Sequence, residues 1–143
     1  MPFNSAEQVE QARQFLESNQ SEVDRLSSLL SLLSKCFLEK IGAAVLPADE
    51  VTTLEECLAS GDLKQLYLRL NRLYGEFVRA GVSDAIWCVL GGLSSWCDAT
   101  GSYWPYMTFG SRQNRLVHAQ QWHDEACVAI EYEAAKAASL AVA

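Results

Sequence analysis

The stretch that decides the fold runs from Ser83 to Cys97 and reads SDAIWCVLGGLSSWC. Its apolar residues leave almost no polar side, so a helix formed here has to be wrapped on most faces by other helices. Gly91 and Gly92 stand in its middle, where each costs roughly 1 kcal/mol relative to alanine, a cost better tolerated where a neighbouring backbone packs closely. The stretch therefore predicts a buried central helix over residues 83–99.

Amphipathic patterns on the N-terminal side of this stretch predict helices that wrap it. The most regular pattern repeats apolar residues at spacings of three and four over residues 63–78. It begins after Asp62, which can cap a helix, and Gly81 supplies a stop. A longer apolar stripe covers residues 23–45 and is ended by Pro47. Both segments are expected to pack their apolar faces against the central helix.

Serine and threonine residues mark the expected starts of the other helices, because their hydroxyl groups accept hydrogen bonds from the first free amides of a helix. The expected starts are Ser5 for residues 6–17, Ser21 after a break at 19–21, Thr53 for a brief helix closed by Gly61, Ser83 for the central helix, and Ser111 for residues 112–140. No segment has a convincing strand pattern. The sequence predicts an all-α protein, a compact single-domain bundle of about six helices formed by residues 1–143.

Negative charge is concentrated in the first half of the chain. The net charge is -7; residues 1–62 hold eleven acids and four bases, whereas residues 63–143 hold seven of each. An acidic surface disfavours direct binding to nucleic acid, which needs clustered lysine and arginine. It suits a basic protein partner, including one that normally holds nucleic acid. The alternative interpretation is that the acidic face only keeps the protein soluble.

The remaining composition predicts a cytoplasmic protein without a membrane segment. The five cysteines are odd in number, form no C-x-x-C pair and fall within apolar helical patterns, which is typical of small buried hydrophobic residues in a reducing compartment. The longest apolar run, residues 85–93, is too short to span a bilayer. The first five residues lead into a polar amphipathic segment, so no signal peptide is expected.

Catalytic and metal-binding patterns are not found in the sequence. His118 and His123 lie five residues apart, about 140° around a helix, and cannot chelate one metal ion from the same helix. His123 and Cys127 share a face and could form a base and a nucleophile, but the sequence identifies no third group to orient them, and a core cysteine is the alternative. Asp124 and Glu125 are expected to be solvated and to point in different directions. We therefore predict a non-enzymatic protein with no cofactor.

An unusual cluster of aromatic residues occupies residues 101–110, which read GSYWPYMTFG. Tyr103, Trp104 and Tyr106 are concentrated here in a loop that glycines bound and Pro105 restrains. Exposed tryptophan and tyrosine side chains are effective anchors for a protein partner. The same residues could instead plug one end of the helical bundle. Both interpretations remain open at the level of sequence.

The run TFGSR at residues 108–112, followed by Leu116 and later by Tyr132 and Glu133, resembles the C-terminal third of all-helical phage anti-CRISPR proteins. The family has T-W-G-S-R at the corresponding place, so Phe109 stands where the family has tryptophan. The resemblance implies a small inhibitor that binds the helicase–nuclease of a type I CRISPR system and prevents its recruitment to DNA. It also implies a phage protein acting in the host bacterial cytoplasm, and a homodimer.

Together these features predict an inhibitor that binds a nucleic-acid-handling bacterial complex through protein–protein contacts. The residues expected to bind the partner are Tyr103, Trp104, Tyr106 and Arg112 as anchors, with Asp49, Glu50, Glu55 and Glu56 complementing a basic surface. Three other hypotheses fit the same sequence. They are an immunity protein that neutralises a bacterial toxin, a helical structural subunit completed by self-association, and a cysteine enzyme built on Cys127 and His123.

Overall fold

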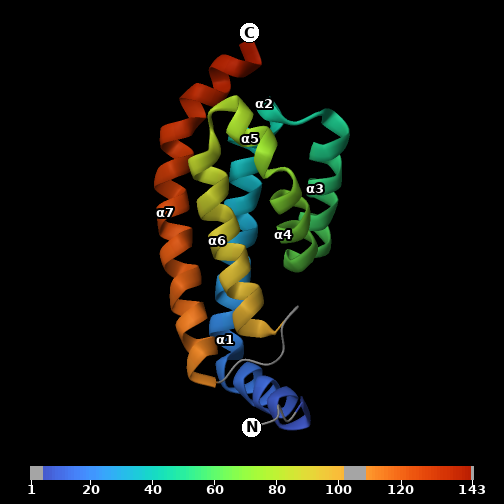
Figure 1. The fold of residues 1–143 in the computed structure, drawn as a ribbon, viewed down its shortest axis with the longest axis vertical. Coiled ribbons are helices and arrows are strands. Elements are labelled where there is room, and N and C mark those ends of the chain that lie inside the picture. Colours follow the sequence, from blue (N-terminus) through green and yellow to red (C-terminus); the bar gives the residue numbers. More distant parts are fainter. Residues whose placement is uncertain (1–4, 102–108, 143) are drawn as a thin grey trace.

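The computed structural model describes residues 5–101 and 109–142, and all regular secondary structure in these ranges is helical. The elements are α1 (Ser5–Phe37), the π-helix η1 (Leu38–Gly42), α2 (Ala43–Val45), α3 (Ala48–Ser60), α4 (Leu63–Arg72), α5 (Tyr74–Ala80), α6 (Ser83–Thr100) and α7 (Phe109–Val142) (Figure 1). The first three follow one another without a break and form one rod, so the described ranges hold six helical segments. The predicted all-α fold class is confirmed.

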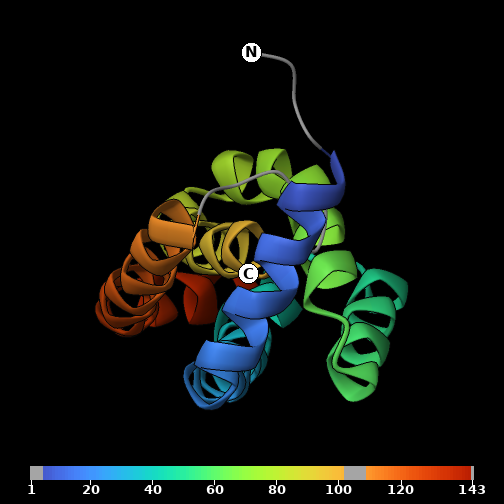
Figure 2. The same cartoon turned by 90° about the horizontal axis from the view of Figure 1, so that it is seen from below.

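Helix α6 is the central helix that the sequence predicts. It packs against α1, α4, α5 and α7, and its inward side chains Ile86, Val89 and Leu93 are fully buried. Seen from below, α7 lies beside α6, while α3 and α4 lie on the far side of the molecule from α7 (Figure 2). One part of the prediction is wrong: Trp87 belongs to the apolar run, yet its side chain is 56% exposed.

The glycine pair of α6 permits the close packing that the sequence predicts, although the closest neighbours are side chains rather than a backbone. A Cβ atom added to Gly91 would lie 2.5 to 2.8 Å from three indole atoms of Trp122, so this ring of α7 lies flat on the glycine. At Gly92 the added atom would meet a methyl group of Leu30 from α1 at 2.9 Å. The two glycines thus let α7 and α1 approach adjacent faces of the same turn of α6.

Helix α7 holds α6 at both ends. At its start, the buried Glu133 carboxylate accepts hydrogen bonds from the backbone amides of Ala85 (2.6 Å) and Asp84 (3.4 Å). At its end, the fully buried Arg112 donates from Nη1 to the carbonyl of Ala99 at 2.9 Å. These are the free donors and acceptors of a helix, and each charge has the sign that the helix dipole favours. Ser83 forms no side-chain cap, so that prediction is wrong.

Two other predicted helix starts are also wrong. Helix α3 begins at Ala48 directly after Pro47, whose carbonyl accepts from the Glu50 and Val51 amides, and residues 48–51 are helical rather than a connection. Thr53 lies inside this helix, where its hydroxyl donates to the carbonyl of Asp49 at 3.0 Å. Helix α7 begins at Phe109, before the predicted cap at Ser111. Asp62 does cap α4, accepting from the Gln65 amide at 3.0 Å.

The predicted interruptions differ in detail from those of the structure. The break expected at 19–21 is confirmed as a kink within α1: Asn19 has non-helical angles (φ -120°, ψ 18°) and separates two helical parts. The regular pattern over residues 63–78 forms two helices, because the chain turns at Leu73 between α4 and α5. The expected stops at Gly61 and Gly81 are confirmed, since both have positive φ and end a helix.

The cysteines are less buried than the sequence predicts. Cys97 is buried, Cys36, Cys57 and Cys88 are half-buried, and Cys127 is exposed. Cys127 lies on the outer part of α7 rather than in the apolar core. None of the described helices is long and apolar enough to cross a membrane.

Candidate functional site

The structure separates the eight residues predicted to bind a partner. Tyr103, Trp104 and Tyr106 lie outside the described residues. Arg112 is a predicted surface anchor, but its side chain is fully buried and its guanidinium group binds the end of α6. Burial lowers the pKa of Arg112. In this conformation the arginine contributes to stability and is not available to a partner.

The four predicted acids all lie on α3, which carries no lysine or arginine. Asp49 and Glu50 belong to its first turn, where negative charge interacts favourably with the helix dipole. Glu56 lines a small hollow of about 210 Å³ between α3 and α4. Glu55 faces the other way, into a larger groove between α3 and the rod formed by α1, η1 and α2. The acids therefore share one helix but not one face of it.

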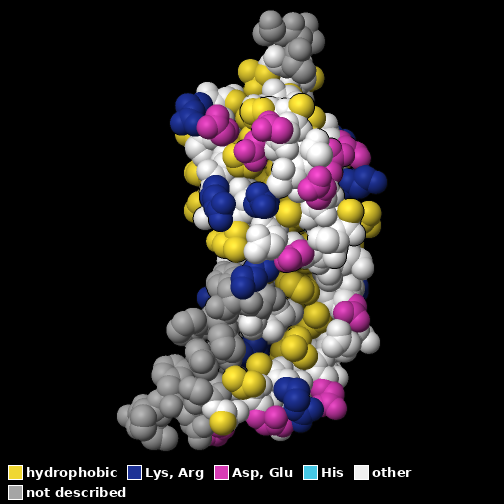
Figure 3. Space-filling view, turned by 90° about the vertical axis from the view of Figure 1, so that its right-hand side faces the viewer, with side chains coloured by type: hydrophobic (Ala, Val, Ile, Leu, Met, Phe, Trp, Pro, Cys, Tyr) yellow, Lys and Arg dark blue, Asp and Glu magenta, His cyan; other side chains and the backbone are white. Residues whose placement is uncertain are grey.

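This groove has a volume of about 580 Å³, and hydrophobic and charged side chains line it together. From the rod come Lys35, Leu38, Glu39 and Ala43, and from α3 come Val51, Glu55, Leu58 and Ala59. Figure 3 looks onto the α3 side of the molecule, where acidic side chains stand among hydrophobic ones over the upper half. The α3 wall extends over eight residue steps, about 12 Å or two helical turns.

The rod wall of the groove is formed largely by the π-helix η1 and its borders. A Cβ atom on Gly42 would lie 2.7 Å from Cδ1 of Leu38, so the end of the leucine side chain packs against the glycine and would have to shift to admit a larger residue. π-Helical turns are rare and are often found at functional sites. The sequence predicts a regular helix up to Val45 and gives no sign of the altered turn.

Charge at the groove comes from both walls. Glu39 and Lys35 line it from the rod, and Glu55 lines it from α3. Sequence reasoning missed Glu39, because the prediction used acids on one short segment and could not place residue 39 opposite them. The groove therefore combines an apolar floor with two carboxylates and one ammonium group, which is the chemistry of a protein-binding surface.

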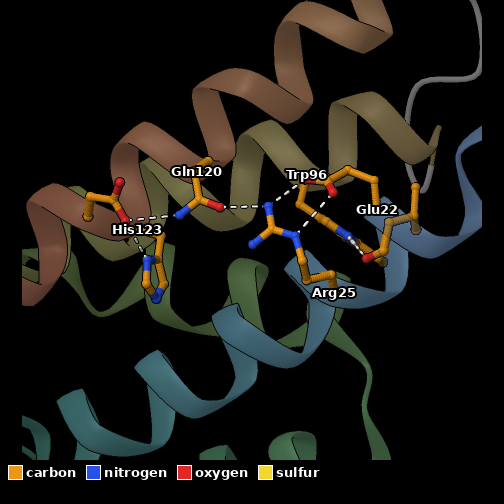
Figure 4. Close-up of polar contacts among 7 residues, drawn as sticks. Glu22, Arg25, Trp96, Gln120 and His123 are labelled. Atoms are coloured by element: carbon orange, nitrogen blue, oxygen red, sulfur yellow. Dashed lines mark hydrogen bonds and ion pairs between the residues drawn. The ribbon is translucent and has the colours of Figure 1, made fainter.

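A second candidate site is the cluster of side chains around His123 and Cys127 on α7. His123 Nδ1 lies 3.0 Å from Oδ1 of Asp124, and its Nε2 lies 3.9 Å from Sγ of Cys127. Gln120 donates to the same aspartate at 2.9 Å and accepts from Arg25 of α1 at 2.7 Å (Figure 4). Asp124 is therefore the orienting group that the sequence does not identify, and its carboxylate is exposed to solvent, as predicted.

The charge states around this thiol do not favour nucleophilic chemistry. The hydrogen bond from His123 is the largest cause that lowers the pKa of Asp124. Burial raises the pKa of Cys127, and the charge of Asp124 raises it further. An activated cysteine needs the opposite shift, since the thiolate is the nucleophile. The apolar groove beside α3 is therefore the better candidate for the functional site.

The geometry defines a groove on an all-α scaffold that hydrophobic side chains, two carboxylates and one ammonium group line together. Comparisons with models of protein families, with curated proteins and with solved structures return no match.

Proposed function

We propose that this protein acts without catalysis, as an inhibitor that binds another protein through the groove between residues 35–43 and α3. The observation that carries this proposal is the position of the groove of about 580 Å³, which lies between the π-helix η1 and a helix with four acids and no base. An apolar floor supplies binding energy through burial, while charges at the rim select the partner.

The shape and charge of the groove support a helical partner segment with basic residues. A groove two turns long accommodates an apolar stripe of two to three side chains at spacings of three and four. Basic residues beside that stripe would meet Glu39 and Glu55, and the four acids of α3 would attract them over a longer range. Proteins that hold nucleic acid present such basic surfaces.

The resemblance to anti-CRISPR proteins supplies the proposed target, the helicase–nuclease of a type I CRISPR system. Two of the residues that carry the resemblance, Arg112 and Glu133, are the buried residues that attach α7 to α6. Tyr132 is 69% exposed. Arg112 and Glu133 therefore concern the attachment of α7 to α6. The proposed binding surface lies on the other side of the bundle.

Reversing the two groove carboxylates tests this proposal. We expect the double variant Glu39→Lys/Glu55→Lys to bind the purified helicase–nuclease about tenfold more weakly, because like charges then meet across the interface. Biolayer interferometry at two salt concentrations would measure the affinity and the association rate.

The matched control is Glu17→Lys/Glu131→Lys, which makes the same change in net charge at exposed positions outside the groove. It should bind within about twofold of the unmodified protein at physiological salt, where distant exposed charges are screened. Equal loss in both double variants would mean that net charge alone drives binding. Absence of binding by the unmodified protein would exclude this target.

A further inference from the structure

A second hollow, of about 300 Å³, lies where α4, α6 and α7 meet and is lined by aromatic side chains. Tyr67 comes from α4, Trp87 from α6 and Trp122 from α7. Gly91 and the polar side chains of Asn71 and Ser94 form most of the rest of the lining. Three aromatic residues from three helices thus surround one cavity on the surface.

The two tryptophans of this hollow are held in place by their neighbours. The indole of Trp122 lies flat on Gly91, with three ring atoms within 2.8 Å of the position that a Cβ would occupy. Trp87 is 56% exposed, and its ring centroid lies 5.9 Å from that of Tyr74 with the planes tilted by 55°. Large exposed aromatic rings held by packing are preorganised for binding, because little side-chain freedom is lost on association.

Acidic side chains lie within one helical turn of both tryptophans of the hollow, and Lys64 lies at the same spacing before Tyr67. No lysine or arginine is among the described residues that line it. Asp84 lies one helical turn before Trp87, and Glu125 lies one turn after Trp122; both carboxylates are exposed. Burial is the main cause that raises the pKa of Cys88, the residue next to Trp87, and the charges of Glu125 and Asp84 raise it further. Both carboxylates therefore act on this part of α6.

We infer that the aromatic hollow binds an organic cation, either the guanidinium group of an arginine or a methylated ammonium group. The faces of tryptophan and tyrosine attract cations, most strongly where water is excluded. The neighbouring carboxylates add attraction without forming a fixed salt bridge inside the hollow. This site is separate from the groove beside α3, and its test does not depend on the proposed inhibitor function.

The test uses the whole protein and small cations as probes, observed through the indole N–H signals of Trp87 and Trp122 in nitrogen-15 NMR spectra. Methylguanidinium chloride represents arginine, and tetramethylammonium chloride represents a methylated ammonium group. Methylurea is the neutral analogue of the first probe, and sodium chloride controls for ionic strength. The Trp96 indole, which donates to the Val23 carbonyl at 3.1 Å, is an internal reference.

We expect at least one cation to shift the Trp87 and Trp122 signals in a saturable way, with the Trp96 signal unchanged. The cation that binds more tightly shows whether the hollow prefers a guanidinium group or a methylated ammonium group. In the variant Trp87→Ala, followed through Trp122, the affinity should fall at least about tenfold, and Trp87→Phe should retain part of it. Equal shifts with methylurea, or no saturable shift with either cation, would overturn the inference.

Discussion

Replacing Glu133 by alanine is expected to lower the free energy of unfolding by about 3 kcal/mol, because the buried amide of Ala85 and the part-buried amide of Asp84 lose their acceptor. The Glu133 carboxylate accepts from Ala85 and Asp84, and its side chain is 1% exposed. The loss corresponds to a fall in melting temperature of roughly 10 °C for a chain of this size. Urea unfolding followed by circular dichroism would measure it.

Two comparisons separate the capping role of Glu133 from a general effect of substitution. Glu133→Gln keeps an oxygen acceptor but loses the charge, so it should cost about 1 kcal/mol. Glu131→Ala, at an exposed position two residues earlier on α7, should change stability by less than about 0.5 kcal/mol. If Glu133→Ala were as stable as Glu131→Ala, the carboxylate would not hold the start of α6.

Replacing Arg112 by alanine is expected to cost about 3 kcal/mol at the other end of α6. The substitution removes the bond to the Ala99 carbonyl and the packing of a long, fully buried side chain. Gly101 and Thr100 already supply donors to the carbonyls of Cys97 and Asp98. Arg112 therefore donates to the Ala99 carbonyl, to which these local contacts supply no donor. Thermal unfolding would measure the stability lost in Arg112→Ala.

Arg115 offers a matched control one turn further along α7. Its side chain is 43% exposed and its Nε lies 3.8 Å from Asp98, so Arg115→Ala should cost no more than about 0.5 kcal/mol. Arg112→Met preserves most of the buried stem and should recover about half of the stability lost in Arg112→Ala. Similar losses for Arg112→Ala and Arg115→Ala would contradict the role assigned to the buried guanidinium.

The sequence is sufficient for the class of fold because its signals are local. The apolar run of α6 needs cover on most sides, and the stops at Gly61 and Gly81 depend on backbone freedom within one turn. The prediction of a serine cap for α6 is wrong for the opposite reason. Glu133 lies about fifty residues away in sequence, so no local pattern can show that it replaces the cap at Ser83.

The candidate sites were harder to predict because they depend on which helices meet. Glu55 is recognisable from sequence as an acid, but its groove has a second wall formed by residues 35–43, which no local pattern places opposite it. Trp87 looks like a core residue in a run with almost no polar side, yet the described structure leaves it largely exposed. Periodicity gives the angle of a residue around its helix, whereas exposure depends on where the neighbouring helices end.

Hydrogen–deuterium exchange of the protein with and without the purified type I helicase–nuclease tests the central claim most directly. We expect binding to slow exchange in residues 35–43 and 51–59, the two walls of the groove, and to leave residues 112–133 of α7 almost unchanged. Side chains from both segments line the groove, so covering it reduces solvent access to both walls. Protection confined to α7, or no protection at saturating partner concentration, would contradict the proposed binding surface.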